Sequence, residues 1–317
     1  MIKKHVRNFL ILTALTSVSI HVINRIISIT STRKSLLKTD HGRFFDWKYG
    51  KIYYTKYGKG SPILLVHDLD PASSSQEWEK ISKTLSKKYT VYTIDLLGCG
   101  RSDKPNLTYT NYLFVQLLKD FIKNVIHEKT SIISMGSSCS FSVMACNMDP
   151  EYYNKLILIN PERLSDLART PDKKKNAMKF LIDLPIIGTM IYNICYSNHM
   201  INKIFMEKYH KNHMVSTKTV DTYYESAHLG NSNGKYLLSS INSCYTGINI
   251  VHALKKVNNS IYIIGSKENE HMKDIIEDYL EYNSSIESAF VEHSKYLPQF
   301  ESPERLLFYI ELFLSSM

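Results

Sequence analysis

Residues 131–146 read SIISMGSSCSFSVMAC. The stretch begins strand-like, passes through five small residues and ends helix-like. A sharp strand-to-helix turn of this kind presents a serine at its tip when small neighbours leave room for the strained backbone. Gly136 and Ser140 stand two residues to either side of Ser138, so the spacing predicts Ser138 at the tip. The same letters also describe a loose small-residue turn before a helix, and the neighbouring segments decide between the two.

The rest of the chain repeats short apolar runs with helical stretches between most of them. Residues 110–127 place apolar side chains at three and four residue spacing, as on a helix that covers a sheet. This alternation predicts right-handed crossovers and a mostly parallel sheet flanked by helices. Ligands bind such sheets at the carboxyl ends of the strands. The continuously apolar runs, expected to be strands buried on both faces, are 62–66, 91–94, 131–135, 156–159 and 261–264.

Several motifs follow these runs in a recognisable order. The most specific is DLLGCGRSDKP at 95–105, and the set resembles the α/β-hydrolase family, in its lidded serine hydrolase branch, from about Phe44 to the C-terminus. The resemblance implies an α/β class, specifically an α/β-hydrolase fold with an inserted helical lid. An N-terminal hydrophobic segment precedes the part of the chain that carries the resemblance. The other motifs are HDLD at 67–70, INP at 159–161, GSKE at 265–268 and YLPQFESPE at 296–304.

A chain of 317 residues exceeds one typical domain, so a core with an inserted subdomain is expected. No strand-like run of the core series falls within 161–254, which we interpret as a helical lid over the strand ends. The hydrolase core then comprises 41–160 and 255–317. Apolar and aromatic side chains of the lid either line a cavity or simply pack the lid onto the core.

The resemblance also implies a catalytic site. Ser138 is the expected nucleophile, and the backbone N–H groups of Leu69 and Cys139 are the expected oxyanion hole. Asp68 stands where the family usually has glycine. Glu268, in the GSKE motif, takes the position of the family's acid, where a solvated carboxylate at a strand end is the plainer interpretation.

The family's histidine position is occupied by Tyr296, because the flanking motifs fix the register on both sides. A phenol with a pKa near 10 does not readily take a serine proton at neutral pH. His293 is the first candidate for a substitute base, and His67 and His271 are two others. Each is equally well interpreted as a surface histidine.

The N-terminal segment, residues 1–40, is basic and apolar. Residues 1–38 contain seven Lys and Arg and no acid, so the remainder carries a net charge of only +2. This distribution of charge favours a membrane partner and gives no support to nucleic-acid binding. His21, Asn24 and Arg25 oppose a full span, since a charge in the bilayer centre costs about 2.5–3.5 kcal/mol. An uncleaved anchor or interfacial helix is expected; a signal peptide and a packed helix are the alternatives.

The five cysteines have no regular spacing. They predict free thiols in a reducing compartment, so we expect a membrane-associated protein whose globular part is cytoplasmic. Neither a metal nor a cofactor is predicted.

Two functions remain compatible with the sequence. The first is a hydrolase fold with a degenerate triad and weak or no turnover that binds a small apolar ligand or a partner. The second is an active serine hydrolase on an ester, thioester or lipid-like acyl substrate, with a relocated histidine as its base.

Overall fold

The computed structural model describes residues 2–316, and within that range eight strands form one sheet. The strands are β1 (Arg43–Trp47), β2 (Gly50–Tyr57), β3 (Pro62–Val66), β4 (Thr90–Ile94), β5 (Thr130–Met135), β6 (Tyr153–Ile159), β7 (Ser260–Ser266) and β8 (Glu287–Val291). Their spatial order is β1-β2-β4-β3-β5-β6-β7-β8. The pairs β1–β2 and β2–β4 are antiparallel, and all the others are parallel. The predicted α/β-hydrolase fold with a mostly parallel sheet is confirmed.

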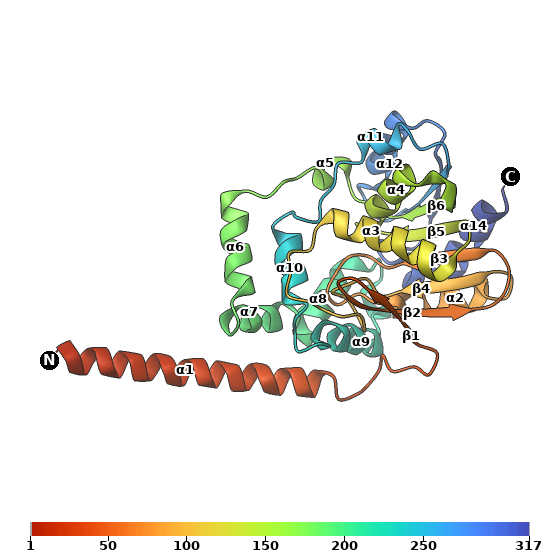
Figure 1. The fold of residues 1–317 in the computed structure, drawn as a ribbon. Helices are drawn as coiled ribbons and strands as arrows, with labels where there is room; N and C mark the ends of the chain where they lie inside the picture. The colour runs from red at the N-terminus through yellow and green to blue at the C-terminus, as the bar shows by residue number, and fades with distance from the viewer. Residues whose placement is uncertain (1, 317) are drawn as a thin grey trace.

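Helices cover both faces of the sheet (Figure 1). Neighbouring Leu64 and Leu65 of β3 are both fully buried and belong to two different core clusters, because successive side chains of a strand point to opposite faces. The cluster around Leu64 packs under α3 (Asn111–Phe121), α4 (Ser138–Met148) and α12 (Met272–Tyr282). The cluster around Leu65 packs under η1 (Ser75–Trp78), α2 (Glu79–Leu85) and α14 (Pro303–Ser315). Short helices at the connections are η2 (Ile122–Ile126), η3 (Pro150–Tyr152) and α13 (Pro298–Glu301).

Between β6 and β7 the described chain is helical and contributes no strand to the sheet. We call α5 to α11 the helical insertion; whether it acts as a lid stays a prediction. The chain bends by 98° between α6 and α7, where Pro185 interrupts the helical path. Its elements are α5 (Leu164–Leu167), α6 (Lys173–Asp183), α7 (Ile187–Cys195), α8 (Asn198–Lys208), η4 (Asn212–Met214), α9 (Thr217–His228), α10 (Lys235–Asn242) and α11 (Val251–Leu254).

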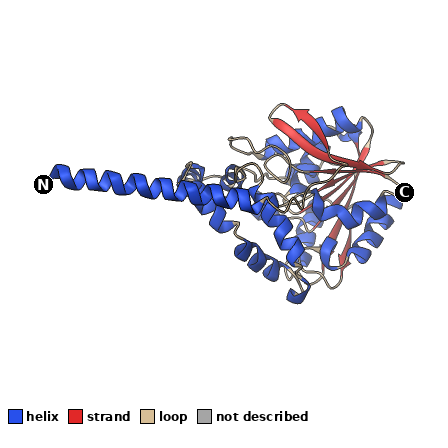
Figure 2. Ribbon diagram, turned by 90° about the horizontal axis from the view of Figure 1, so that it is seen from below, coloured by secondary structure: helices blue, strands red, loops and turns tan. Residues whose placement is uncertain are grey.

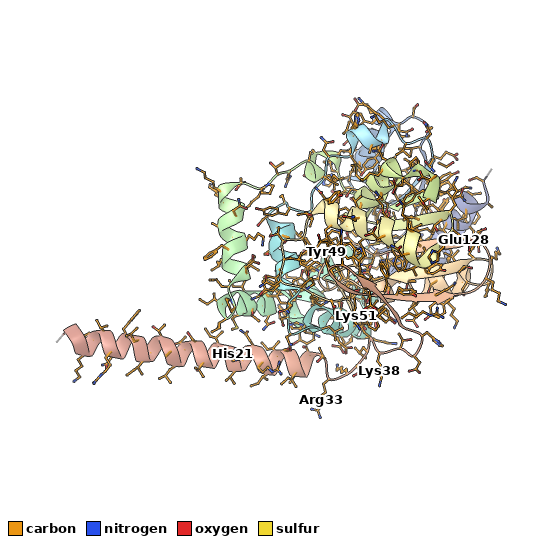
Figure 3. All side chains as sticks on the ribbon, in the orientation of Figure 1. His21, Arg33, Lys38, Tyr49, Lys51 and Glu128 are labelled. Carbon is orange, nitrogen blue, oxygen red and sulfur yellow. The ribbon has the colours of Figure 1, made fainter. Side chains whose placement is uncertain are left out.

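The N-terminal helix α1 (Ile2–Ser31) extends well beyond the globular body (Figures 1 and 2). Figure 3 labels His21 on this helix, and Arg33 and Lys38 in the loop that follows it. Within Lys4–Ser31 an 18-residue window has a mean hydropathy of 1.7, and only 6% of that window is buried. It is long and apolar enough to cross a membrane, and a signal sequence near an N-terminus has the same properties.

The C-terminal third of α1 is docked on the helical insertion through polar side chains. Asn24 is buried; its amide donates to the carbonyl of Ile186 at 3.0 Å and its Oδ1 accepts from Nδ2 of Asn193 at 3.0 Å. Arg25 donates to Oδ1 of Asn231 at 2.9 Å. Asn24 and Arg25, two of the polar residues that interrupt the apolar sequence, therefore bind protein. Exposed apolar side chains lie on both sides of them, from Val6 to Ile23 and at Ile26 and Ile29.

Candidate functional site

The turn after β5 has Gly136 at its tip. Met135 is the last residue of β5, and Gly136 follows it with a φ of 58°, in the left-handed region that suits glycine. Ser137 already has helical dihedral angles, and α4 begins at Ser138. The sharp strand-to-helix turn predicted from the sequence is present, but its tip lies two residues before Ser138.

Ser138 is fully buried within the first turn of α4. Its Oγ donates to the carbonyl oxygen of His67 at 2.7 Å. The structure therefore corrects the expected position of Ser138, because its hydroxyl faces backbone at the foot of the helix and has no accessible surface. Its role as a nucleophile stays a prediction, and this geometry does not favour it.

A carboxylate occupies the place where the resemblance implies an oxyanion. Oδ1 of Asp68 accepts the backbone N–H of Leu69 at 2.8 Å and that of Ser137 at 2.9 Å. The predicted Leu69 amide is thus one of two converging donors. The other is not the predicted Cys139 amide, which donates to the carbonyl of Gly136 at 3.1 Å within the turn.

Asp68 and Gly136 depend on each other sterically. A Cβ placed on Gly136 would lie 2.2 Å from Oδ1 of Asp68, far inside van der Waals contact. A side chain at the tip of the turn is therefore incompatible with the carboxylate in its present position. The sequence places Asp68 at a position where the family usually has glycine, but its dependence on Gly136 becomes visible only in the structure.

Ser137 has a second acidic partner that the sequence analysis missed. Its Oγ donates to Oε1 of Glu162 at 2.5 Å, and Glu162 lies in the loop after β6. Burial, with Asp68 nearby, raises the pKa of Glu162. The sequence did contain a signal for Glu162. It follows the apolar run 156–159 and Pro161, and a residue directly after a buried strand lies at the carboxyl edge of the sheet, where ligands bind.

The predicted acid and the predicted substitute base lie together, away from the turn. Glu268 follows β7 and His293 follows β8, and with His210 of the helical insertion their potential ligand atoms lie within 4.8 Å of one another. Two histidines and one carboxylate are a donor set that suits Zn²⁺. None of the three lines the cavities at the turn that are described below.

The other histidines and Tyr296 differ in their access to the turn. Both ring nitrogens of His67 are engaged: Nε2 accepts the Leu96 N–H at 3.0 Å and Nδ1 donates to the Asp68 carbonyl at 2.6 Å. Burial lowers the pKa of His67, so the ring is neutral and fully used. His271 and Tyr296 line the same cavity as Gly136. Tyr296 therefore lies beside the turn, and its assignment to the family's histidine position stays a prediction.

Two neighbouring cavities meet at Asp68 and Met135. The smaller one, of about 190 Å³, lies between the strand ends and the helical insertion, and we call it the inner cavity. Its core side carries Asp70 and Glu77, and its opposite wall is largely aromatic and aliphatic. The insertion residues in that wall are Cys195, Tyr196, Ile201, Ile204, Phe205, Lys208, Tyr223 and Leu238. The larger one, of about 470 Å³, includes Gly136, Glu162, His271 and Tyr296.

Burial dominates the electrostatics of the inner cavity. It raises the pKa of Glu77 from its usual value to about 7, and it also raises the pKa of Asp70. Asp70 accepts hydrogen bonds from the Ala72 N–H at 2.8 Å and from the Tyr196 hydroxyl at 3.1 Å. The cavity is therefore apolar on one wall and acidic on the other.

Comparison with known proteins agrees with this architecture. Residues 62–182 match the alpha/beta hydrolase fold family. A serine hydrolase involved in carbazole degradation superimposes with a TM-score of 0.71 at 18% identity, over 86% of this chain and 98% of that one. With its sheet order, turn and helical insertion, the chain belongs to the α/β-hydrolase fold family.

Individual relatives cover only part of the sequence. A 2-hydroxy-6-oxo-6-(2'-aminophenyl)hexa-2,4-dienoic acid hydrolase of Metapseudomonas resinovorans is 33% identical over 110 residues, which are 33% of this chain and 37% of the relative. A soluble epoxide hydrolase of Corynebacterium sp. (strain C12) is 26% identical over 101 residues, 31% of this chain and 35% of the relative. The chain therefore aligns with about a third of the length of these relatives.

Proposed function

We propose that this chain is a non-hydrolytic member of its family that binds a small, largely apolar ligand beneath the helical insertion and is held at a membrane by α1. The observation that carries the first part is the Asp68 carboxylate on the Leu69 and Ser137 amides. An oxyanion needs those two donors free, and a carboxylate both uses them and repels a second negative charge.

The nucleophile supports the same proposal. In this fold the amide of the residue after the nucleophile joins an amide from the loop after β3. Here those amides belong to Ser137 and Leu69, which assigns the nucleophile position to Gly136. Glycine supplies no attacking atom, and the next two hydroxyls are engaged, with Glu162 and with the His67 carbonyl.

The proton acceptor is also unsuited to hydrolysis. Tyr296 lines the cavity beside Gly136, and a phenol is a poor base at neutral pH. His293 lies with Glu268 and His210 outside that cavity. Loss of the base alone removes on the order of 10⁴ to 10⁶ in rate in serine hydrolases.

Covalent labelling tests the proposal. A fluorophosphonate reacts with an activated serine, so we expect the wild-type protein to label no more than its Ser138→Ala variant. Gel fluorescence of folded protein, checked by circular dichroism, measures this. Strong wild-type labelling that disappears in Ser138→Ala would instead support the alternative, an active serine hydrolase on ester, thioester or lipid-like acyl substrates.

Restoring the missing groups is a second, independent test. The combined substitutions Asp68→Gly, Gly136→Ser and Tyr296→His free both amides, place a hydroxyl at the tip and supply an imidazole. We expect fluorophosphonate labelling of this triple variant to rise at least about tenfold above wild type. The three groups are restored together because the contributions of catalytic groups that act as a unit are not additive. The matched control carries Gly136→Ala in place of Gly136→Ser. A folded triple variant that labels no better than this control would contradict the assignment of Gly136.

The membrane part of the proposal rests on α1. The apolar side chains of residues 6–18 are exposed, with Phe9 at 68% and Leu12 at 64%. Residues 4–20 of a helix extend about 25 Å, close to the thickness of a bilayer's hydrocarbon core. The docking of Asn24 and Arg25 on the helical insertion favours a retained anchor over a cleaved signal. All five cysteines are free thiols, which fits a globular part in a reducing compartment.

A further inference from the structure

Glu77 is a buried acid without a full set of partners. It belongs to η1, is 3% exposed and lines the inner cavity. Its Oε1 has no well-formed hydrogen bond among the described residues, and its Oε2 has a 3.4 Å contact from Nε2 of Gln299. The side chains of Ser73 and Tyr223 lie close enough to lower the pKa of Glu77 as weak hydrogen-bond donors, but burial outweighs them. An unpaired buried carboxylate oxygen is costly, so a donor that completes it has a large energetic advantage.

The charges around the inner cavity are unbalanced. Asp68, Asp70 and Glu77 contribute three carboxyl groups, whereas Lys208 is the one basic residue of the lining. Asp68 already accepts two backbone amides, and Asp70 accepts an amide and a tyrosine hydroxyl. Glu77 is therefore the acid with unused acceptor capacity. An added positive charge at Glu77 would reduce this imbalance.

The opposite wall suits the body of an organic cation. Tyr196, Phe205 and Tyr223 place three aromatic rings in the lining, and Ile201 and Ile204 add aliphatic surface. Aromatic faces attract ammonium groups, and the aliphatic side chains bury hydrocarbon. A volume of about 190 Å³ is slightly larger than the 150 Å³ cavity known to hold benzene. A single ring with a short amine arm therefore matches its size.

We propose that the inner cavity binds a primary amine of about one ring in size, with the ammonium on Glu77 and the ring against Tyr196, Phe205 and Tyr223. This inference deepens the proposed ligand-binding function and rests on it. The ammonium supplies three N–H donors, of which Glu77 Oε1 takes one. The hydrocarbon part of the amine makes the same contacts with the apolar wall that any apolar ligand of this size would make.

Matched probes separate charge from shape. Benzylamine, benzyl alcohol and benzoate share a ring, and we expect benzylamine to bind full-length protein in nanodiscs at least about tenfold more tightly than either. Ligand-observed NMR measures the three affinities. Glu77→Gln keeps the shape and should abolish the preference, whereas Glu79→Gln, exposed and two residues away, should leave it unchanged.

The dependence on pH gives a second readout. Ammonium binding favours ionised Glu77, and since burial raises the pKa of that carboxyl to about 7, benzylamine affinity should increase as pH rises through 7. The affinity for benzyl alcohol should stay flat. Benzylamine binding should also release a proton, seen as buffer-dependent heat in titration calorimetry. The groups that face Glu77 are Asp68, Asp70, Cys99, Lys208, Tyr209 and Tyr223.

The outcomes distinguish failure of this inference from failure of the proposed function. Equal binding of benzylamine and benzyl alcohol, unchanged in Glu77→Gln, would overturn the proposal of an amine ligand. It would leave the inner cavity as a binding site for apolar ligands. If benzoate binds most tightly and this binding is lost in Lys208→Gln, the ligand is an anion held by Lys208 and not a cation held by Glu77. Absence of binding by all three probes, with fluorophosphonate labelling of Ser138, would overturn both proposals. Thermal unfolding of each variant confirms that it is folded.

Discussion

Asp95 and Arg101 form a buried ion pair in the loop after β4. Nε of Arg101 lies 2.8 Å from Oδ2 of Asp95, whose side chain has no exposed surface. The same carboxylate accepts the backbone N–H groups of Ser75 and Arg101 at 2.7 and 2.8 Å. The most specific motif in the sequence is thus a structural clamp that holds the η1 loop, and with it Glu77, against the strand ends.

Removal of this clamp has a predictable cost. Asp95→Asn leaves Arg101 without its charge partner, and we expect the free energy of unfolding to fall by about 3–5 kcal/mol. Urea denaturation followed by circular dichroism measures the loss. Asp103→Asn, in the same motif but outside the pair, is the control. An Asp95→Asn protein as stable as wild type would show that the pair is not a net stabiliser.

The same pair sets a dependence of stability on pH. Burial by itself raises the pKa of Asp95, but Arg101 outweighs it and lowers the pKa to about 2. A carboxyl with a folded-state pKa below its unfolded value of about 4 stabilises the fold above pH 4 and loses that contribution as pH falls towards 2. We expect wild type and Asp95→Asn to converge in stability across that window. Parallel urea midpoints from pH 5 to 2 would contradict this.

The candidate site was only partly predictable from its residues. Small residues flank both Gly136 and Ser138 in and around GSSCS, so the sequence allows either residue at the tip of the turn. Only the backbone conformation decides between them. The strand ends at Met135, so the positive φ falls on Gly136, two residues before the serine that the spacing indicated. The Leu69 amide and Tyr296 both lie at this turn, and each belongs to a motif whose register the sequence fixes; their predicted roles stay predictions.

At the scale of elements, the buried strands were predictable and the outer ones were not. All five continuous apolar runs became strands, from β3 to β7, because a strand covered on both faces leaves a simple hydrophobic signal. β1, β2 and β8 have exposed and buried residues mixed along their lengths. Their sequences therefore carry no comparable run, and pairing with the adjacent strand defines them.

The junction between α1 and α7 also depends on contacts that a sequence does not show. Asn193 of α7 links Asn24 to Ser232, whose Oγ donates to Asn193 Oδ1 at 2.9 Å. We expect Asn193→Leu to loosen α1 and to increase tryptic cleavage at Arg25 or Arg33 several-fold, measured by mass spectrometry. Asn198→Leu, on α8 and exposed, is the control. Equal cleavage of both variants would contradict a specific polar junction.

At the scale of the whole molecule, charge and apolar surface are concentrated at one end. The N-terminal 38 residues supply seven of the nine net positive charges, and residues 6–29 carry much of the exposed hydrocarbon. We expect full-length protein to float with phosphatidylcholine–phosphatidylserine vesicles. Replacing Leu10, Leu12 and Leu15 by serine should reduce the floated fraction at least about tenfold, because each loses buried hydrocarbon in the bilayer. Flotation unchanged by this variant would locate the membrane contact elsewhere.

Helix α7 connects that end of the molecule with the inner cavity. It holds Asn24 of α1 through Asn193, and its last residue, Cys195, lines the cavity next to Tyr196. Asn193 and Cys195 are only two residues apart on this helix. If α1 is held in a membrane and the cavity binds a ligand, as proposed, a change in the tilt of α1 would shift the cavity wall, and bilayer thickness, which affects helix tilt, would then alter ligand affinity.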